Sequence, residues 1–291
     1  MRQIRPYLYV LPFLMIMVFI FFGGLAQAFL QSLGYLPVFG MNDFTLDYYR
    51  QVINDARFIS SLRYTFYIAL LSSLLSVILG VILAFIVRNL GLGGGFSFKL
   101  YRVPIIMPHI VVVILIFGIF FQTGIISRIT FAIGLINNPH DFPLLVNDRG
   151  GIGIMLVYLY KQVPFVAYMI FTSLQSISPI YGSIAENLGA SRLRVFYKII
   201  LPMIFPSILS AFLITFAFAF GAFEVPFLLG SPARQTLPVL AYIDYSSPVH
   251  GTRPPAMAMS IIISAISLCL IWAYAAVLKR FSKFGIEGGL L

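Results

Sequence analysis

The chain has 291 residues, of which 60% are hydrophobic and only 10% are charged, and its formal net charge is +10. Charged residues make up about a quarter of an ordinary soluble domain, so this composition excludes such a domain and indicates a protein that folds largely in lipid. The basic residues flank apolar segments and form no stripe with interleaved aromatics, which argues against nucleic acid as a partner. A single cysteine, Cys269 within an apolar run, excludes a disulfide framework.

Six apolar runs are long enough to cross a bilayer, whose hydrocarbon core takes roughly 20 residues of helix. They predict transmembrane helices at 7–30, 64–87, 103–127, 150–178, 203–229 and 254–278. Helix is the expected conformation because every backbone polar group in lipid must be paired within its own segment. The expected fold class is therefore an all-α membrane protein. Because no linker separates the runs, we expect residues 1–291 to form a single transmembrane domain.

The distribution of lysine and arginine predicts the orientation. With both termini inside, eleven basic residues fall on the cytoplasmic side and seven fall outside. An excess of basic residues marks cytoplasmic loops, so we expect both termini in the cytoplasm. The first run, with Arg2 and Arg5 before it and Ala26-Gln27-Ala28 near its end, also resembles a signal peptide. It is longer than the apolar part of such a peptide, so we expect a retained span.

The short loops carry no recognisable reaction chemistry. The glycine-rich turn 91–95 is not followed by the Lys-Ser or Lys-Thr pair of a phosphate-binding loop, so we expect no nucleotide site on this chain. His140 and Asp141 stand together after the third run, but two ligands do not make a metal site. We expect no metal, no cofactor and no catalytic residue here, and we interpret His109 as a hydrogen-bonded interior histidine.

A polar segment, about 178–202, separates the fourth and fifth runs. Ser178 is a good N-cap and Pro179 suits the first helical position. Apolar residues follow at helical spacing, and Gly189 can end that helix in a left-handed conformation. A second helix is expected from Ser191. The pattern alone leaves two interpretations open: a helix that enters a groove on a soluble partner, or one that lies on the lipid surface.

Gly189 is followed ten residues later by Ile199 and then by Leu201-Pro202. This spacing resembles the EAA loop, by which permease subunits of binding-protein-dependent ABC importers hold their ATPase. The family's Glu-Ala-Ala triplet falls here on 183–185, so its leading Glu is absent, and Glu186 lies one turn further on. The resemblance, which covers about residues 40–280, implies ATPase docking through Ser183, Ile184, Ala185, Glu186, Leu188, Gly189, Ala190, Ser191 and Arg192.

Lys161 and Glu224 are the only charged residues well inside predicted spans. A charge facing lipid costs roughly 2.5–3.5 kcal/mol or more near the bilayer centre, so each needs a partner or water. Two alternatives remain open: a salt bridge between spans four and five, or a water-filled path that meets the substrate. The segment 221–230 resembles that of the polyamine, thiamine and iron branch of importer permeases. The candidate path residues are Lys161, Gln162, Glu224 and Pro226.

These features predict a type I ABC importer permease with six transmembrane helices, acting in transport and not in catalysis. The resemblance implies a second permease subunit (a homologue or a second copy), two ATPase subunits that bind ATP and Mg²⁺, and an extracytoplasmic solute-binding protein, at a bacterial inner membrane. The expected cargo is a small polar or charged solute, with a polyamine-like solute favoured and a sugar as the alternative. An ion-coupled secondary transporter is the rival class, but its usual internal inverted symmetry is not found.

Overall fold

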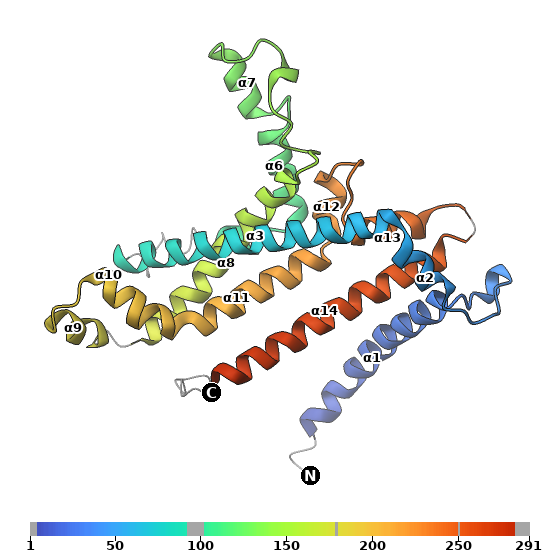
Figure 1. Ribbon diagram of the computed structural model, residues 1–291, viewed down its shortest axis with the longest axis horizontal. Helices are drawn as coiled ribbons and strands as arrows, with labels where there is room; N and C mark the ends of the chain where they lie inside the picture. Colours follow the sequence, from blue (N-terminus) through green and yellow to red (C-terminus); the bar gives the residue numbers. More distant parts are fainter. Residues whose placement is uncertain (1–4, 92–101, 178–179, 250, 283–291) are drawn as a thin grey trace. The chain divides into compact units, whose positions relative to one another are not determined.

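The computed structural model describes residues 5–91, 102–177, 180–249 and 251–282 (Figure 1). Regular structure in these ranges is helical, apart from an isolated bridge between Leu36 and Met41. Six helical segments are long and apolar enough to cross a membrane: Val10–Ser32, Ala56–Asn89, His109–Ala132, Ile152–Ser176, Leu193–Gly221 and Arg253–Ala276. The prediction of an all-α protein with six spans is confirmed, and the orientation of its termini stays a prediction. The predicted cap at 178–179 lies outside the described residues.

The chain divides into two compact units, Met1–Leu62 with Leu237–Ile266 and Arg63–Thr236 with Ser267–Leu291. Two of the three division points fall within long helices, α3 (Ala56–Asn89) and α14 (Arg253–Ser282), and the third lies directly before Leu237. The single domain expected from the sequence stays a prediction.

The first unit packs short helices against the ends of the two long ones. Its other elements are α1 (Arg5–Ser32), η1 (Pro37–Phe39), α2 (Asp47–Asn54) and α13 (Leu237–Ser246). The core joins Val52 of α2 and Phe58 of α3 to Leu240 of α13 and Met259 of α14. None of the most apolar stretch of α1 is buried within the chain. Lipid or another subunit must therefore cover that helix.

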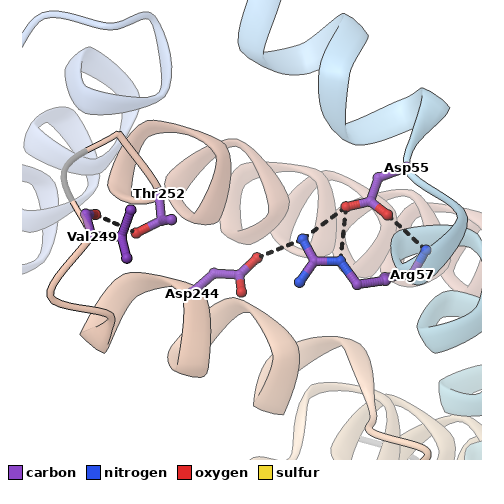
Figure 2. A network of polar contacts seen from close by, with 5 residues as sticks. All are labelled: Asp55, Arg57, Asp244, Val249 and Thr252. Atoms are coloured by element: carbon purple, nitrogen blue, oxygen red, sulfur yellow. Dashed lines mark hydrogen bonds and ion pairs between the residues drawn. The ribbon is translucent and has the colours of Figure 1, made fainter.

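A small charged network fixes the junction between α2 and α3 (Figure 2). Asp55 accepts a hydrogen bond from the backbone N–H of Arg57 at 2.7 Å, which makes it the N-cap of α3. The Arg57 guanidinium reaches back to Asp55 at 2.9 Å and across to Asp244 of α13 at 3.5 Å. The network thus ties two parts of this unit that are almost 190 residues apart in the sequence.

The second unit contains the remaining helices and the candidate sites. Besides most of α3 and the last part of α14, they are α5 (Val103–Ile106), α6 (His109–Phe120), α7 (Ile125–Ala132), η2 (Pro139–Asp141), α8 (Ile152–Ser176), α9 (Ile180–Asn187), α10 (Arg192–Val195), η3 (Phe196–Ile200), α11 (Leu201–Gly221) and α12 (Glu224–Leu229). The η3 turn is a π-helical insertion that runs without a break from α10 into α11.

α3, α8 and α11 form the core of this unit. Ala84, Ile170 and Ala211 are among its buried residues, one from each helix. α3 and α8 run parallel, because Ser76 faces Gln162 and Gly80 faces Val166 at the same offset in the sequence. At Gly80 the helices are so close that a Cβ would lie 2.6 Å from the Val166 Cβ. Only glycine allows this approach.

Two of the predicted spans are interrupted. The third was predicted as continuous over 103–127, but Met107 is extended (ψ 133°) and separates α5 from α6, because a residue before proline is disfavoured in the helical region. The fifth was predicted to reach 229, but helix α11 ends at Gly221 and Ala222 is extended (ψ 134°). Glu224 therefore does not lie within the long helix and instead begins the separate helix α12.

Candidate functional site

The predicted docking segment is an ordered helix and turn. Gly189 has a φ of +84°, as expected for a left-handed helix end. Its N–H donates to the Glu186 carbonyl at 2.9 Å, and the Ala190 N–H donates to the Ala185 carbonyl at 2.9 Å. This pair of bonds is a Schellman motif, which satisfies carbonyls that the end of α9 would otherwise leave free. The prediction that Gly189 takes the left-handed conformation is confirmed.

Ser191 begins the second helix of the segment. Its hydroxyl accepts from the Arg194 N–H at 3.4 Å and its carbonyl from the Val195 N–H at 3.0 Å, so it caps α10, which starts at Arg192. α9 folds against α10, where a Cβ on Gly182 would meet Val195 at an ordinary 3.9 Å. The predicted sequence of helix, glycine turn and second helix is thus present, with α9 over Ile180–Asn187.

The outer surface of this segment is apolar. Ile184 is 53% exposed, Leu188 84% and Leu193 68%, while Ser183 and Glu186 are exposed polar residues on the same helix. Because exposed apolar surface of this kind marks an interaction site, the segment fits either a protein groove or a lipid surface. The ATPase contacts themselves stay a prediction.

Lys161 lies half-buried on α8 and faces the break between α5 and α6. Its ammonium donates a short hydrogen bond to the Met107 carbonyl. The neighbouring Tyr160 hydroxyl approaches the Met107 sulfur at 3.7 Å. The Met107 carbonyl is available because the Val111 N–H bonds to Pro108 instead, at 3.1 Å. Lys161 therefore supplies the hydrogen bond that the interrupted helix lacks.

Glu224 is exposed at the start of α12, and no ion pair joins it to Lys161 in the ranges that the structure describes. Glu224 is nevertheless close enough to act electrostatically on both Lys161 and His109. The structure therefore brings three titratable side chains into one neighbourhood without pairing them directly.

His109 is a member of this neighbourhood that the sequence interpretation did not select. It begins α6, and its ring stacks on Phe218 of α11 with centroids 5.0 Å apart. In the sequence, the position of His109 directly after Pro108 is the only indication of its place, since that proline fixes where α6 begins. His109, Lys161 and Glu224 together place one charged or titratable group on each of α6, α8 and α12.

Gln162 and Pro226, the other two candidate path residues, are buried among the helices. Gln162 is buried against α3 and accepts a hydrogen bond from the Ser76 hydroxyl at 3.0 Å. Pro226 is also buried, and its carbonyl accepts the Gly230 N–H at 2.9 Å. Among the described residues no group of three metal-ligating side chains occurs. Lys161 and Glu224 thus remain accessible candidates, whereas Gln162 and Pro226 support the helices around them.

Residues 76–283 match the family described as the inner membrane component of binding-protein-dependent transport systems. This match covers more than half of the chain. The chain belongs to that family. It is a permease subunit of an ABC importer and a multi-pass membrane protein, as the six spans and the EAA-like spacing predicted.

Curated relatives carry different cargoes. The chain is 27% identical over 219 residues to the putrescine transport system permease protein PotI of Escherichia coli, covering 74% of this chain and 71% of the relative. It is 23% identical over 237 residues to the sulfate permease protein CysT of Salmonella typhimurium, covering 81% and 82%. It is 26% identical over 256 residues to the molybdate/tungstate permease protein WtpB of Pyrococcus furiosus, covering 86% and 93%. The polyamine branch is therefore not singled out.

Solved structures share the fold. A bacterial ABC transporter involved in the import of the acidic polysaccharide alginate superposes with a TM-score of 0.72 at 18% identity, over 96% of this chain and 98% of the other. A second structure of an alginate transporter, in complex with a periplasmic protein that carries an alginate pentasaccharide, gives a TM-score of 0.71 at 18% identity over 99% of both chains. The type I importer permease fold predicted from the sequence agrees with these similarities.

Proposed function

We propose that this chain forms half of the translocation path of an ATP-driven importer for a small polar or charged solute. The observation that carries the proposal is the position of Lys161, His109 and Glu224, which gather where α5–α6 and α11–α12 are interrupted. Interrupted helices are tolerated at membrane depth where they line a cavity or contact other protein. Charged side chains there are expensive unless they meet water, a partner or cargo.

The energy comes from partner subunits. Two ATPases, with ATP and Mg²⁺, dock on α9 and the turn at Gly189 of this chain and of a second permease subunit. The exposed apolar side chains of Ile184 and Leu188 fit a groove on such a partner. α8 ends at Ser176, three residues before α9, and α11 follows η3. Movement of α9 therefore acts on α8, which carries Lys161, and on α11, which precedes Glu224.

The transport cycle follows from this connection. ATP-driven closure of the ATPases brings the two α9 helices together, and each permease core rocks so that the path opens outward. A solute-binding protein then releases its cargo into the path, and ATP hydrolysis returns the path to the inward-facing state. The two termini and the segment 178–202 lie in the cytoplasm of a bacterial cell, below its inner membrane.

The favoured cargo is a polyamine-like solute, with a sugar as the alternative. Support comes from the exposed carboxylate of Glu224, which can meet an ammonium group, and from the similarity to a putrescine permease. The sulfate and molybdate/tungstate relatives make oxyanions the necessary comparison.

The test is uptake by the reconstituted importer. Permease, ATPases and the loaded binding protein are placed in liposomes, and uptake of labelled putrescine, maltose and sulfate is followed with and without ATP. ATP-dependent uptake of putrescine alone is the expected result. Uptake that persists without ATP under an ion gradient would instead indicate a secondary transporter.

A further inference from the structure

A groove of about 330 Å³ lies within the first unit, between the segment after α1 and the segment that joins α13 to α14. Its lining is mostly apolar and includes Leu36, Phe39, Met41, Pro248, Val249 and Arg253. The surface around it is apolar as well, since Val38 is 88% exposed and Phe44 is 63% exposed. Exposed apolar surface of this density marks an interaction site.

Arg253, the first residue of α14, supplies the charge among the described residues that line this groove. Its guanidinium carbon lies 5.1 Å from the centre of the Phe39 ring and 5.3 Å from that of Tyr245. Within the described ranges no carboxylate pairs with it and no acceptor takes its hydrogen bonds. Contact with aromatic rings leaves the N–H donors at the edge of the guanidinium available for a bidentate acceptor.

The walls of the groove are held in place before anything binds. The Thr252 hydroxyl donates to the Val249 carbonyl at 3.0 Å, which fixes the turn at the border, and Arg57 ties α13 to Asp55 through Asp244 (Figure 2). On the other wall, Leu36 and Met41 form an isolated β-bridge, in which the Leu36 N–H donates to the Met41 carbonyl at 2.8 Å. A preformed surface loses less conformational entropy on binding than a flexible one.

We propose that this groove receives a loop of the solute-binding protein, in which an acidic side chain flanked by apolar residues pairs with Arg253. The inference rests on the proposed function, because the predicted topology places both walls of the groove on the extracytoplasmic side. An apolar pocket with one unpaired guanidinium is complementary to a carboxylate on an apolar loop. A phospholipid also offers an anionic group and apolar chains, so a lipid and a second copy of this chain are the other outcomes that the experiment must separate.

The experiment titrates ATP hydrolysis by the reconstituted importer with its solute-binding protein. Arg253→Gln is expected to raise the concentration of loaded binding protein that gives half-maximal stimulation by roughly ten-fold, since a charge-assisted pair is lost. The maximal rate stays near the wild-type value, because Arg253 lies outside the path and the docking segment. Arg50→Gln is the matched control: this exposed arginine on α2 does not line the groove.

Val249→Asp is a second test in which Arg253 is kept. A carboxylate on the border of the groove pairs with Arg253 within the chain and competes with the partner, so the half-maximal concentration is again expected to rise. Wild-type titration curves for both Arg253→Gln and Val249→Asp would overturn the inference. Loss of the permease dimer in these variants would also overturn it, because the groove would then be a contact between copies of the chain. Absence of any stimulation in the wild-type importer would overturn the proposed function as well.

Discussion

Lys161 shows how a charge within a membrane helix can be satisfied without a counter-ion. The carboxyl end of a helix carries partial negative charge on its free carbonyls, and the break at Met107–Pro108 exposes one of them to α8. The sequence left two alternatives open, a salt bridge to Glu224 or a water-filled path. The structure indicates a different role for each of the two residues. Lys161 has a structural bond, whereas Glu224 is exposed and lacks an ion pair among the described residues.

This difference in role predicts different effects for the two substitutions. Lys161→Met removes a charged hydrogen-bond donor from the Met107 carbonyl in this half-buried site, which costs about 1.5–3 kcal/mol, and should reduce the yield of assembled importer. Glu224→Gln should assemble normally and hydrolyse ATP, yet import less solute. Because the two side chains are not directly paired, the double variant should assemble as poorly as Lys161→Met. Size-exclusion yield and uptake measure both effects, and recovery of assembly in the double variant would show that the pair exists.

Asp55 is expected to give a pH-dependent contribution to stability. Burial alone would raise its pKa, but the hydrogen bonds from the Arg57 backbone and guanidinium outweigh burial and hold the pKa below its usual value. A lowered pKa stabilises the fold above the unfolded value near 3.9, and this contribution is lost as the pH falls through the folded pKa. The pH-dependent contribution of Asp244 to stability has the opposite sign, because burial raises its pKa despite the nearby Arg57.

Asp55→Ala should therefore destabilise the protein by about 1 kcal/mol at neutral pH, mainly through loss of the N-cap of α3. The difference from the wild type should stay constant between about pH 7 and pH 5 and narrow below about pH 4. Asp244→Asn, which keeps the cap, is the control and should change stability less at neutral pH. Thermal unfolding in detergent measures these differences. A gap between Asp55→Ala and the wild type that does not narrow in acid would show that the carboxylate charge is not what stabilises this junction.

At the scale of the element, α9 depends on one backbone conformation. Gly189→Asp places a side chain at φ +84°, a conformation that glycine adopts most readily, and should destabilise the Schellman turn by roughly 1 kcal/mol. The added charge also faces the proposed ATPase groove. The purified complex should then lose its ATPases while the permease stays in the membrane. Co-purification of the ATPases with the variant at wild-type stoichiometry would contradict docking at this turn.

Gly182→Ala is the matched control for that substitution. Gly182 lies within α9 at an ordinary helical conformation, and its new Cβ would meet Val195 at 3.9 Å, a normal contact distance. Alanine also favours helix more than glycine does, so stability should rise slightly and ATPase binding should be unchanged. A loss of ATPases from both variants would point to a general effect on the segment and not to the turn.

The sequence predicts most of the helices because apolar length and glycine or proline positions act locally. The six spans and the turn at Gly189 depend on such local signals. The interruption at Met107 was not foreseen, although Pro108 was visible, because proline in a membrane helix either kinks it or breaks it according to the packing around it. The burial of Gln162 against Ser76 depends on the pairing of α3 with α8, and hydrophobic periodicity does not specify which helices pair.

At the scale of the whole molecule, function depends on which ends of the helices face the cytoplasm. The proposed docking segment and the proposed groove for the binding protein must lie on opposite sides of the membrane, and the charge distribution of the sequence predicts that they do. α9 follows the end of α8, whereas η2 (Pro139–Asp141) precedes its beginning. Since α8 is one of the six candidate spans, α9 and η2 should lie on opposite sides of the membrane.

Cysteine labelling in intact cells tests this topology. The native thiol of Cys269 is exposed and must first be replaced by serine. Asn138→Cys, at the exposed turn beside η2, should then react with an impermeant maleimide from outside, while Ser191→Cys at the start of α10 should react only after the membrane is permeabilised. The two sites are both exposed in the folded chain, so a difference in reactivity reports the side of the membrane and not burial. Labelling of Ser191→Cys in intact cells would reverse the orientation and, with it, move the ATPase docking site and the Arg253 groove to the wrong sides for their proposed partners.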